Sequence, residues 1–444
     1  MNHMKIIYSL LFILLCSPIH AKDVFTTEDI YSLKDITLSD VSEDGNGIVF
    51  ITSQAENKYD GFKNTLYFLD THKGKKVKLI ESYGSKGMNF SSIKFSSNSK
   101  SIFFLSSGMK TSGKESNQIW SLSLSNRVKR KVTNFDGDIS DYDVSDDGKT
   151  IAFIGQRSSD KKADTKTPPP IVIDRYQFKR DYEGFLGPNR DHLFIFDTQS
   201  RKVEQITSGQ KDHLYPSISP NGENIAYMTK EGDFDRHNNW EIFIKNIKGE
   251  ESHRKLLSNN GEDISISYPS RPEWSPDGKK IAYLHGGDHS MLWYALQEVS
   301  IINVETGDID FITQGFDRNT TLPKWSRDGQ DIFFILEDNM KSQLMKYSFL
   351  DNTTKKITPD NMYLSGYDKS YHVTDDEIIF QSSTSEIPSE IYHLKEDQIN
   401  PITSVNEQFI KNKLIGSTEL ISFQSFDGLT INGMMIKPPN FDSK

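Results

Sequence analysis

A short turn-and-strand pattern recurs along the chain and constrains its fold more than any other feature. Each copy ends one strand, makes a Ser-x-Asp/Asn-Gly turn and starts a new strand of apolar and aromatic residues. Asp or Asn accepts backbone hydrogen bonds in such a turn, and Gly supplies a positive φ. The five clear copies are "VSEDGNGIVFIT" from Val41, "VSDDGKTIAFIG" from Val144, "ISPNGENIAYMT" from Ile218, "WSPDGKKIAYLH" from Trp274 and "WSRDGQDIFFIL" from Trp325. Two weaker copies start at Phe95 and Val373, and we expect looser turns there because Ser99 and Glu377 replace Gly.

A second pattern follows each copy: a strand, a polar turn and another strand, often closing on Ile-Thr, as in "DHLFIFDTQSRKVEQIT" from Asp191. Each unit of about 50 residues therefore holds four strands, and seven units occur. A four-stranded sheet repeated around an axis buries both its faces against its neighbours. The sequence predicts an all-β fold, a seven-bladed β-propeller of four-stranded antiparallel blades over residues 38–405. The strands that enter the turns should lie nearest the axis.

One unit contains an insertion at about residues 155–190, because the distance from Gly148 to Gly222 is longer than the other repeats. Its first half is polar and ends in Pro168-Pro169-Pro170, which is typical of a loop. Its second half, "IVIDRYQFKRDYEGF", is rich in charged and aromatic residues. Long loops on a rigid scaffold often carry function. The alternative interpretation is a solvated, charged excursion.

The N-terminus is typical of an export signal. Lys5 precedes the apolar run from Ile6 to Cys16, and Ala21 stands at a plausible cleavage site,. The apolar run is too short to span a membrane comfortably. We therefore expect residues 1–21 to be a signal peptide, residues 22–37 to be a lead-in, and the protein to be periplasmic or secreted. Cys16 is the only cysteine, so the mature chain has no cysteine nucleophile and no cysteine metal site.

Charge and motifs narrow the classes of function. The net charge of −10 argues against nonspecific binding to nucleic acid or to an anionic membrane,. No Gly-x-Ser-x-Gly nucleophile elbow and no Gly-rich phosphate loop occur in the sequence,. "HGGDH" at 285–289 and "DFDRHNNWE" at 233–241 are interpreted as solvated loops rather than metal sites,. We predict no catalytic residue, metal or cofactor in this chain.

The last residues predict a separate hairpin. The alternating runs Leu420–Phe426 and Leu429–Ile436 flank Asp427-Gly428, a strong signal for a tight turn,. Together with the signal, the propeller turns and the insertion "IVIDRYQFKRDYEGFLGPNRDHLFIFD", this tail, "FQSFDGLTINGMMIKPPNFDSK", resembles the prolyl oligopeptidase family of serine peptidases. The likeness is to the acylaminoacyl-peptidase and bacterial dipeptidyl-peptidase branch.

This resemblance implies that an α/β-hydrolase domain follows the propeller. Residues 406–444 would be the linker and the first hairpin of that domain, truncated here, and the catalytic Ser, Asp and His would lie beyond Lys444. The propeller would limit access to short peptides and would pack against the hydrolase domain as its partner. By chemistry and location, the candidate substrate-binding residues are Arg175, Arg180, Asp181 and Glu183.

The alternative is a binding module similar to the periplasmic TolB-type propellers, which dock other envelope proteins. Such proteins carry a small α/β domain before a propeller that usually has six blades. The segment from Lys22 to Asp40 is too short for that domain. The alternative also leaves the tail hairpin unexplained.

Overall fold

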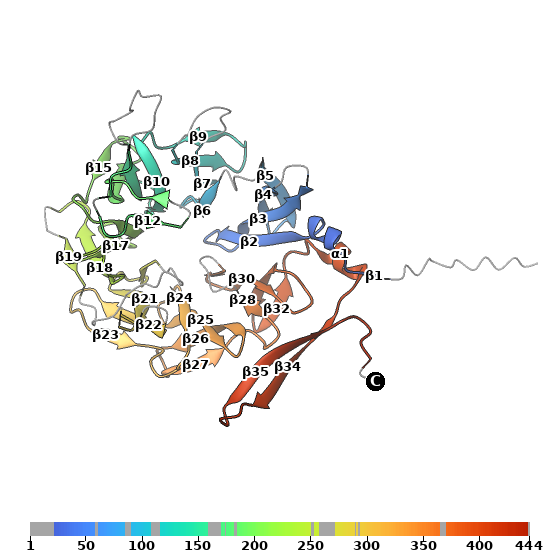
Figure 1. The fold of residues 1–444 in the computed structure, drawn as a ribbon. Helices are drawn as coiled ribbons and strands as arrows, with labels where there is room; N and C mark the ends of the chain where they lie inside the picture. The colour runs from blue at the N-terminus through green and yellow to red at the C-terminus, as the bar shows by residue number, and fades with distance from the viewer. Residues whose placement is uncertain are drawn as a thin grey trace, which may run out of the picture.

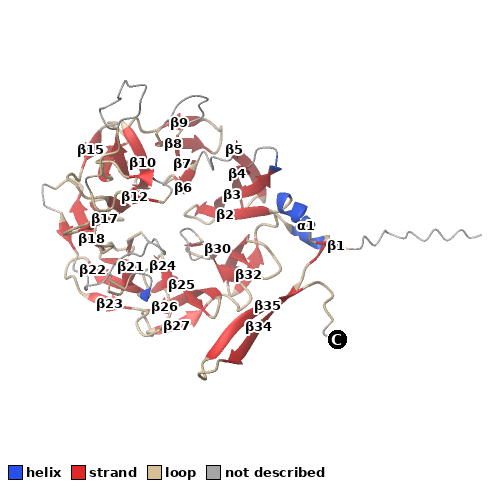
Figure 2. Ribbon diagram, viewed as in Figure 1, coloured by secondary structure: helices blue, strands red, loops and turns tan. Residues whose placement is uncertain are grey.

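The computed structural model describes residues 22–57, 61–84, 90–107, 116–158, 170–173, 175–181, 184–249, 253–256, 271–288, 290–291, 294–364 and 370–442. Seven sheets are arranged around a central axis, and almost every regular element is a strand (Figures 1 and 2). The predicted all-β, seven-bladed propeller is therefore confirmed.

We number the blades in chain order. Blade 1 is formed by β2 (Lys34–Val41), β3 (Gly47–Glu56), β4 (Gly61–Asp70) and β5 (Lys75–Gly84). Blade 2 is formed by β6 (Ser91–Phe95), β7 (Ser101–Ser106), β8 (Gln118–Ser123) and β9 (Lys129–Lys131). Blade 3 is formed by β10 (Gly137–Val144), β11 (Thr150–Arg157), β14 (His192–Asp197) and β15 (Val203–Gln205). Blade 4 is formed by β16 (His213–Ile218), β17 (Asn224–Lys230), β18 (Trp240–Asn246) and β19 (Arg254–Lys255). Blade 5 is formed by β20 (Glu273–Trp274), β21 (Lys280–Gly286), β22 (Gln297–Asn303) and β23 (Ile309–Phe311).

Blade 6 is formed by β24 (Thr320–Trp325), β25 (Asp331–Asp338), β26 (Lys341–Ser348) and β27 (Thr353–Lys356). In blade 7 the inner position is shared by β28 (Tyr363–Leu364) and β29 (Tyr371–Val373), which both pair with β30 (Ile378–Ser383), followed by β31 (Glu390–Lys395) and β32 (Gln398–Pro401). The first strand of each blade faces the axis and the fourth forms the rim, as β6 and β9 show in Figure 1. The prediction about which strands lie nearest the axis is confirmed.

The recurring turns are built as their sequence predicts. In the first, the Ser42 hydroxyl donates to Asp44 Oδ1 at 2.6 Å, and the Gly47 N–H donates to Ser42 Oγ at 2.6 Å. Gly45 has a φ of 72°, in the left-handed region that favours glycine,. The expectation of a looser turn at Ser99 is wrong, because Ser99 takes a φ of 53° and its N–H still donates to the Ser96 carbonyl at 2.7 Å.

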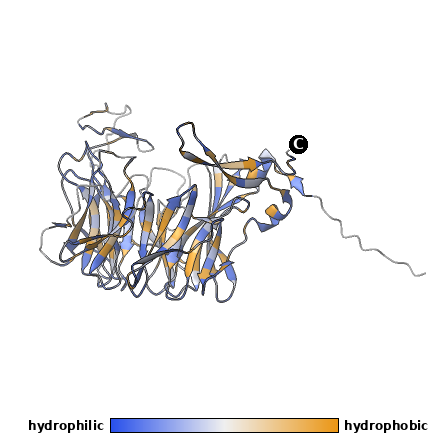
Figure 3. Ribbon diagram, turned by 90° about the horizontal axis from the view of Figure 1, so that it is seen from below, coloured by the Kyte–Doolittle hydropathy of each residue, from blue (hydrophilic) through white to orange (hydrophobic). Residues whose placement is uncertain are grey.

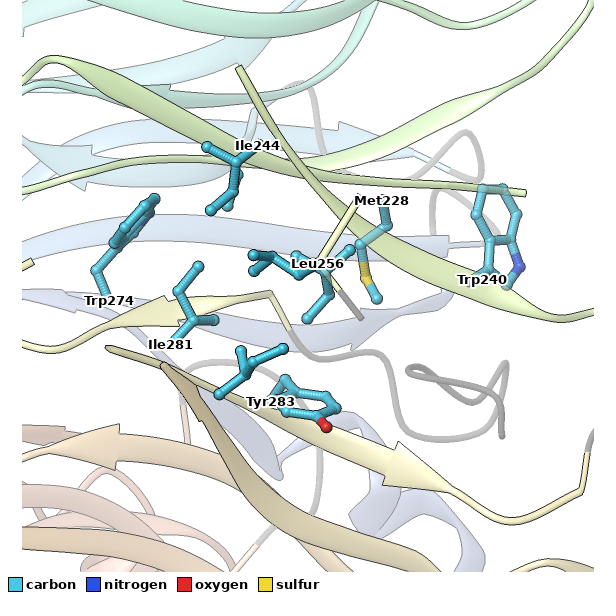
Figure 4. Close-up of a cluster of buried hydrophobic side chains, with 10 residues drawn as sticks. Met228, Trp240, Ile244, Leu256, Trp274, Ile281 and Tyr283 are labelled. Carbon is cyan, nitrogen blue, oxygen red and sulfur yellow. The ribbon is translucent and has the colours of Figure 1, made fainter. Parts of the chain in front are cut away.

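The hydrophobic core lies between the blades rather than in one centre. Each cluster of buried apolar side chains joins two neighbouring sheets, as Met228 and Ile244 of blade 4 meet Trp274, Ile281 and Tyr283 of blade 5 (Figure 4). The inner-strand aromatics also donate hydrogen bonds to the preceding blade. The Tyr142 hydroxyl donates to the Ser92 carbonyl, Trp274 Nε1 to the Ser217 carbonyl, Trp325 Nε1 to the Glu273 carbonyl and the Tyr371 hydroxyl to the Leu322 carbonyl.

The ring closes without exchanging a strand between its first and last blades. Each of these blades is built from its own end of the described chain. Outside the ring, β1 (Asp23–Val24) pairs in parallel with β33 (Lys413–Leu414). Two short helices, a 3₁₀ helix at Thr27–Tyr31 and α1 at Glu407–Lys411, complete this closing clasp. None of the helices in the described ranges has the length and apolarity to cross a membrane.

The tail forms the expected hairpin. β34 (Ser417–Gln424) pairs with β35 (Thr430–Lys437), and Gly428 in the turn has a φ of 88°. Seen from the side, this hairpin and the described part of the insertion project from the same face of the ring (Figure 3). We call this face the insertion face, and we call the opposite one, which carries the Ser-x-Asp-Gly turns, the turn face.

Candidate functional site

The insertion lies against blade 4 through a partly buried ion pair. Arg175 Nη2 donates to Asp235 Oδ1 at 2.5 Å and Arg175 Nε donates to Asp235 Oδ2 at 3.1 Å. The two side chains are only 9% and 11% exposed. The hydrogen bonds from Arg175 hold the pKa of Asp235 below its ordinary value. Because the Arg175 guanidinium makes two hydrogen bonds to the Asp235 carboxylate and is largely covered, it fixes the position of the insertion,.

The loop between β17 and β18 contacts the insertion, and Lys230 stabilises this loop through hydrogen bonds to its backbone. This lysine is 6% exposed. Its ammonium donates to the Phe234 carbonyl at 3.1 Å and to the His237 carbonyl at 2.7 Å. It also lies 4.9 Å from the centre of the Trp240 ring. These contacts hold the backbone on either side of Asp235 in place.

The interpretation of residues 233–241 as a solvated loop needs a correction at Asp235, whose side chain is only 11% exposed. Asp235 is partly covered by Arg175, which is 60 residues away in the sequence. The polar composition of the segment predicts that it is exposed. Asp235 is nevertheless covered, because the connection between β11 and β14 packs against the loop between β17 and β18. Asp233 and Arg236 are the exposed part, and they pair with each other at 3.1 Å.

The other predicted site residues are placed differently. Arg180, in the short hairpin of β12 (Lys179–Arg180) and β13 (Gly184–Phe185), lies 3.8 Å from Asp212 of blade 4. Asp181 is exposed next to this hairpin. Glu183 lies outside the described residues. Arg175 and Arg180 are thus brought to one side of blade 4, and both contact acidic residues there.

An open pocket of about 320 Å³ lies between the insertion and the blade 4 loop. The insertion contributes aromatic and charged side chains, and the loop contributes charged and polar ones. Its lining residues are Tyr176, Gln177, Phe178, Lys179, Asp235, Arg236, His237 and Asn238.

The "HGGDH" segment belongs to blade 5. His285 lies at the end of β21, with its ring centre 5.4 Å from that of Phe311, and His289 lies outside the described residues. Within the described ranges, no group of three or more His, Cys, Asp or Glu side chains is placed to hold a metal ion.

Charged side chains on the inner strands connect the blades around the axis. Lys94 of blade 2 lies 2.6 Å from Asp143 of blade 3, and although burial raises the pKa of Asp143, Lys94 and Arg271 together hold it below its ordinary value. Arg271 also pairs with Asp141 at 2.8 Å and Lys324 with Glu273 at 4.0 Å, and the His372 ring nitrogen Nδ1 lies 3.6 Å from Asp40 Oδ1.

Exposed apolar side chains gather on the insertion face. Strand direction places the second-to-third strand connections of every blade on this face, and the large exposed side chains in or beside them are Phe62, Tyr83, Ile171, Val172, Ile173, Tyr176, Phe178, Phe185, Met291, Tyr294, Met340 and Ile387. Among the described residues, the opposite ends of the blades expose Val128, Val203 and Leu350. One face is thus markedly more apolar than the other.

The tail hairpin projects from the same face, at the outer edge of the ring (Figures 1 and 3). Asn432 Nδ2 of β35 donates to Asn339 Oδ1, in the turn between β25 and β26 of blade 6, at 2.7 Å. By strand alternation, Ile421, Phe423, Ile431 and Met435 share the hairpin side opposite to Asn432, and all four are at least 37% exposed,. A two-stranded sheet of this kind is marginal alone and gains stability from further packing.

Fold and sequence together define the class of protein as a seven-bladed β-propeller. Its first and last blades share no strand, and one of its faces is more apolar than the other. The family follows from a direct match. The family model described as the TolB beta propeller domain matches residues 183–410, and the chain belongs to this family.

Several known relatives are peptidases, as the resemblance noted from the sequence predicted. The uncharacterized peptidase YuxL of Bacillus subtilis is 21% identical over 449 residues, which cover 95% of this chain and 65% of the relative. Dipeptidyl-peptidase 5 of Porphyromonas gingivalis is 22% identical over 231 residues, covering 51% of this chain and 32% of the relative. The chain therefore spans less than two thirds of the length of these relatives.

Solved structures show the same fold. The acylaminoacyl peptidase of Pyrococcus horikoshii matches with a TM-score of 0.70 and 17% identity, over 93% of this chain and 59% of that one. At this identity the match is evidence about the fold alone.

Proposed function

We propose that this chain is the noncatalytic propeller part of an exported serine peptidase that acts on short peptides. In this proposal the insertion face covers an α/β-hydrolase domain that follows residue 444, and the propeller restricts which substrates reach it. The observation that carries the proposal is the apolar insertion face. A face on which exposed apolar side chains gather, as they do here, is a candidate interaction site,.

The tail hairpin supports the same arrangement. It leaves the ring beside the clasp, lies at the outer edge of the ring and contacts blade 6 through Asn432 (Figure 1). Its outward side carries Ile421, Phe423, Ile431 and Met435. These side chains would be buried if further strands of a catalytic domain packed on the hairpin.

The activity of the chain itself tests the proposal. We expect the purified chain to show no turnover of chromogenic dipeptide or acyl-amino-acid substrates and no labelling by a reagent for active-site serines. The physical reason is that a Ser-His-Asp site needs its nucleophile elbow. Turnover that persists through purification, together with labelling, would overturn the noncatalytic assignment.

The mass of the native protein tests the claim that a hydrolase domain follows the propeller, and its N-terminal residue tests the claim of export. An antibody against the propeller should detect a species clearly larger than 50.8 kDa in the source cells. N-terminal sequencing of that species should begin at Lys22 if the signal peptide is removed. A mature protein that still starts at Met1 would contradict export by this signal.

The second candidate is a protein-binding module, which the match to the TolB beta propeller domain favours. Its apolar face would then bind a separate protein rather than a domain of the same chain. A native species near 50.8 kDa that copurifies with one partner and has no peptidase activity would support this alternative.

A further inference from the structure

The pocket between the insertion and blade 4 combines cationic side chains with exposed aromatic rings. Tyr176 is 64% exposed and Phe178 is 41% exposed, although both line a pocket. The Arg236 guanidinium lies over the Tyr176 ring, 4.3 Å from its centre. A guanidinium that stacks on a ring keeps its N–H groups directed outward in the plane of the fork, where they can bind a carboxylate.

The negative charge of Asp235 does not neutralise the positive charges of Lys179 and Arg236 in the pocket. Asp235 already accepts two hydrogen bonds from Arg175, and Arg190 and Lys230 add positive charge nearby. Within the described parts of the chain, Lys179 has no ion-pair partner. The pocket therefore presents a local positive charge on a chain whose net charge is −10.

The Arg236 pair with Asp233 is exchangeable. Its side chains are 61% and 65% exposed, and an ion pair so open to water contributes little to stability,. A ligand carboxylate can take the place of Asp233 at small cost. Lys179 from the insertion and Arg236 from blade 4 then bind the ligand from two sides.

We propose that this pocket binds the C-terminal carboxylate of a short peptide, with the last side chain of the peptide packed against Tyr176 and Phe178. The biological role of the site rests on the proposed peptidase function and names the end of the substrate that the propeller holds. The single negative charge of a carboxylate suits a site formed by Lys179 and the exchangeable Arg236. The rings supply the apolar contact that a simple inorganic anion cannot use.

The test is calorimetric titration of the chain with an acetylated tripeptide that ends in phenylalanine. We compare the free acid with its C-terminal amide, which has the same shape without the charge. Because charge-assisted hydrogen bonds are stronger than neutral ones but are weakened by exposure, we expect the acid to bind about three- to tenfold more tightly. Lys179→Gln and Arg236→Gln should each reduce the affinity for the acid toward that for the amide.

Lys100→Gln is the matched control, because Lys100 is an exposed lysine on the turn face. It should leave binding of the acid unchanged. Equal affinity for acid and amide, no binding of either, or equal effects of Lys179→Gln and Lys100→Gln would overturn the proposal. Displacement of the acid by inorganic phosphate at lower concentrations than the peptide itself would also overturn it, because the site would then be a general anion site. Catalysis plays no part in these measurements, so their failure is distinct from failure of the proposed peptidase function.

Discussion

At the scale of single residues, Arg175 shows how one side chain positions a long connection. The insertion has little regular structure among its described residues beyond the short β12–β13 hairpin. Arg175 attaches it to blade 4 through both oxygens of Asp235. A planar guanidinium suits this geometry because it offers two parallel donors, which a lysine cannot.

We predict that Arg175→Ala releases the insertion from blade 4. Removing Arg175 leaves the partly buried Asp235 carboxylate without its two charged hydrogen bonds, which is unfavourable,. Limited proteolysis should cut the insertion faster, and Arg175→Lys should restore only part of the resistance. A double-mutant cycle with Asp235→Asn should give a coupling free energy of about 2 kcal/mol. Arg201→Ala, at an exposed arginine of blade 3, is the control. A coupling near zero would contradict the assignment of Arg175 as the anchor.

At the scale of elements, the contact between blades 3 and 4 holds a chain of rings in which His213 and His253 contact Tyr227 and His192 contacts His213. The ring centres of His192 and His213 are 5.4 Å apart, and the Tyr227 hydroxyl lies 2.6 Å from His253 Nδ1. Burial lowers the pKa of all three histidines, and it lowers that of His213 to about 4. The charged side chains that face them are Asp212, Arg190 and Lys245.

We predict that this contact loses stability in mild acid. The folded state keeps His213 neutral, whereas the unfolded chain takes up a proton near pH 6.5, so the unfolded state binds more protons in this window. The contribution is fully present above about pH 6.5 and falls as the pH drops toward 4, by up to about 3 kcal/mol for His213,. Denaturant unfolding across this range measures it.

His213→Asn is the informative variant, because an amide nitrogen can replace the donor that His213 Nδ1 offers to the Asp191 carbonyl at 2.9 Å. The slope of stability against pH should flatten in this variant. His72→Asn, at an exposed histidine of blade 1, should keep the original slope. An unchanged slope in His213→Asn would show that the acid sensitivity arises elsewhere.

At the scale of the whole molecule, the seam between blades 7 and 1 is held by side chains instead of a shared strand. On the insertion side, Asn406 donates to the Lys34 carbonyl at 2.8 Å and accepts from the Lys34 N–H at 2.9 Å. Lys413 pairs with Asp29 at 2.8 Å, with both side chains 13% exposed. On the turn face, Arg327 reaches from blade 6 to Glu43 of blade 1 at 2.7 Å.

We predict that Asn406→Ala weakens this seam selectively. Asn406 is 2% exposed, and its loss leaves both polar groups of the Lys34 backbone without their partner. The expected loss of stability is about 2 kcal/mol. Hydrogen exchange should accelerate first in β2 and β31. Asn400→Ala, on the exposed outer strand of blade 7, should have little effect. Uniform acceleration over all blades would contradict a local seam.

The sequence by itself determined the features that depend on neighbouring residues. Turn chemistry acts within about five residues and strand alternation within about ten, so Gly45 and its counterparts, the seven four-stranded units and the tail hairpin at Asp427-Gly428 could all be predicted. The apolar strands also predicted that the blades must stack, because one sheet cannot bury both its faces alone.

Tertiary structure alone decided which distant residues meet. The partners Arg175 and Asp235 are 60 residues apart, and Asn406 and Lys34 are 372 residues apart. No local pattern selects these partners, because each pair forms only after whole blades have taken their places around the axis. The sequence identified Arg175 as a candidate but could not show that Asp235 would occupy its guanidinium, nor that Lys179 and Arg236 would share a pocket. The burial of a charged side chain depends on what packs over it, and that is set by the ring as a whole.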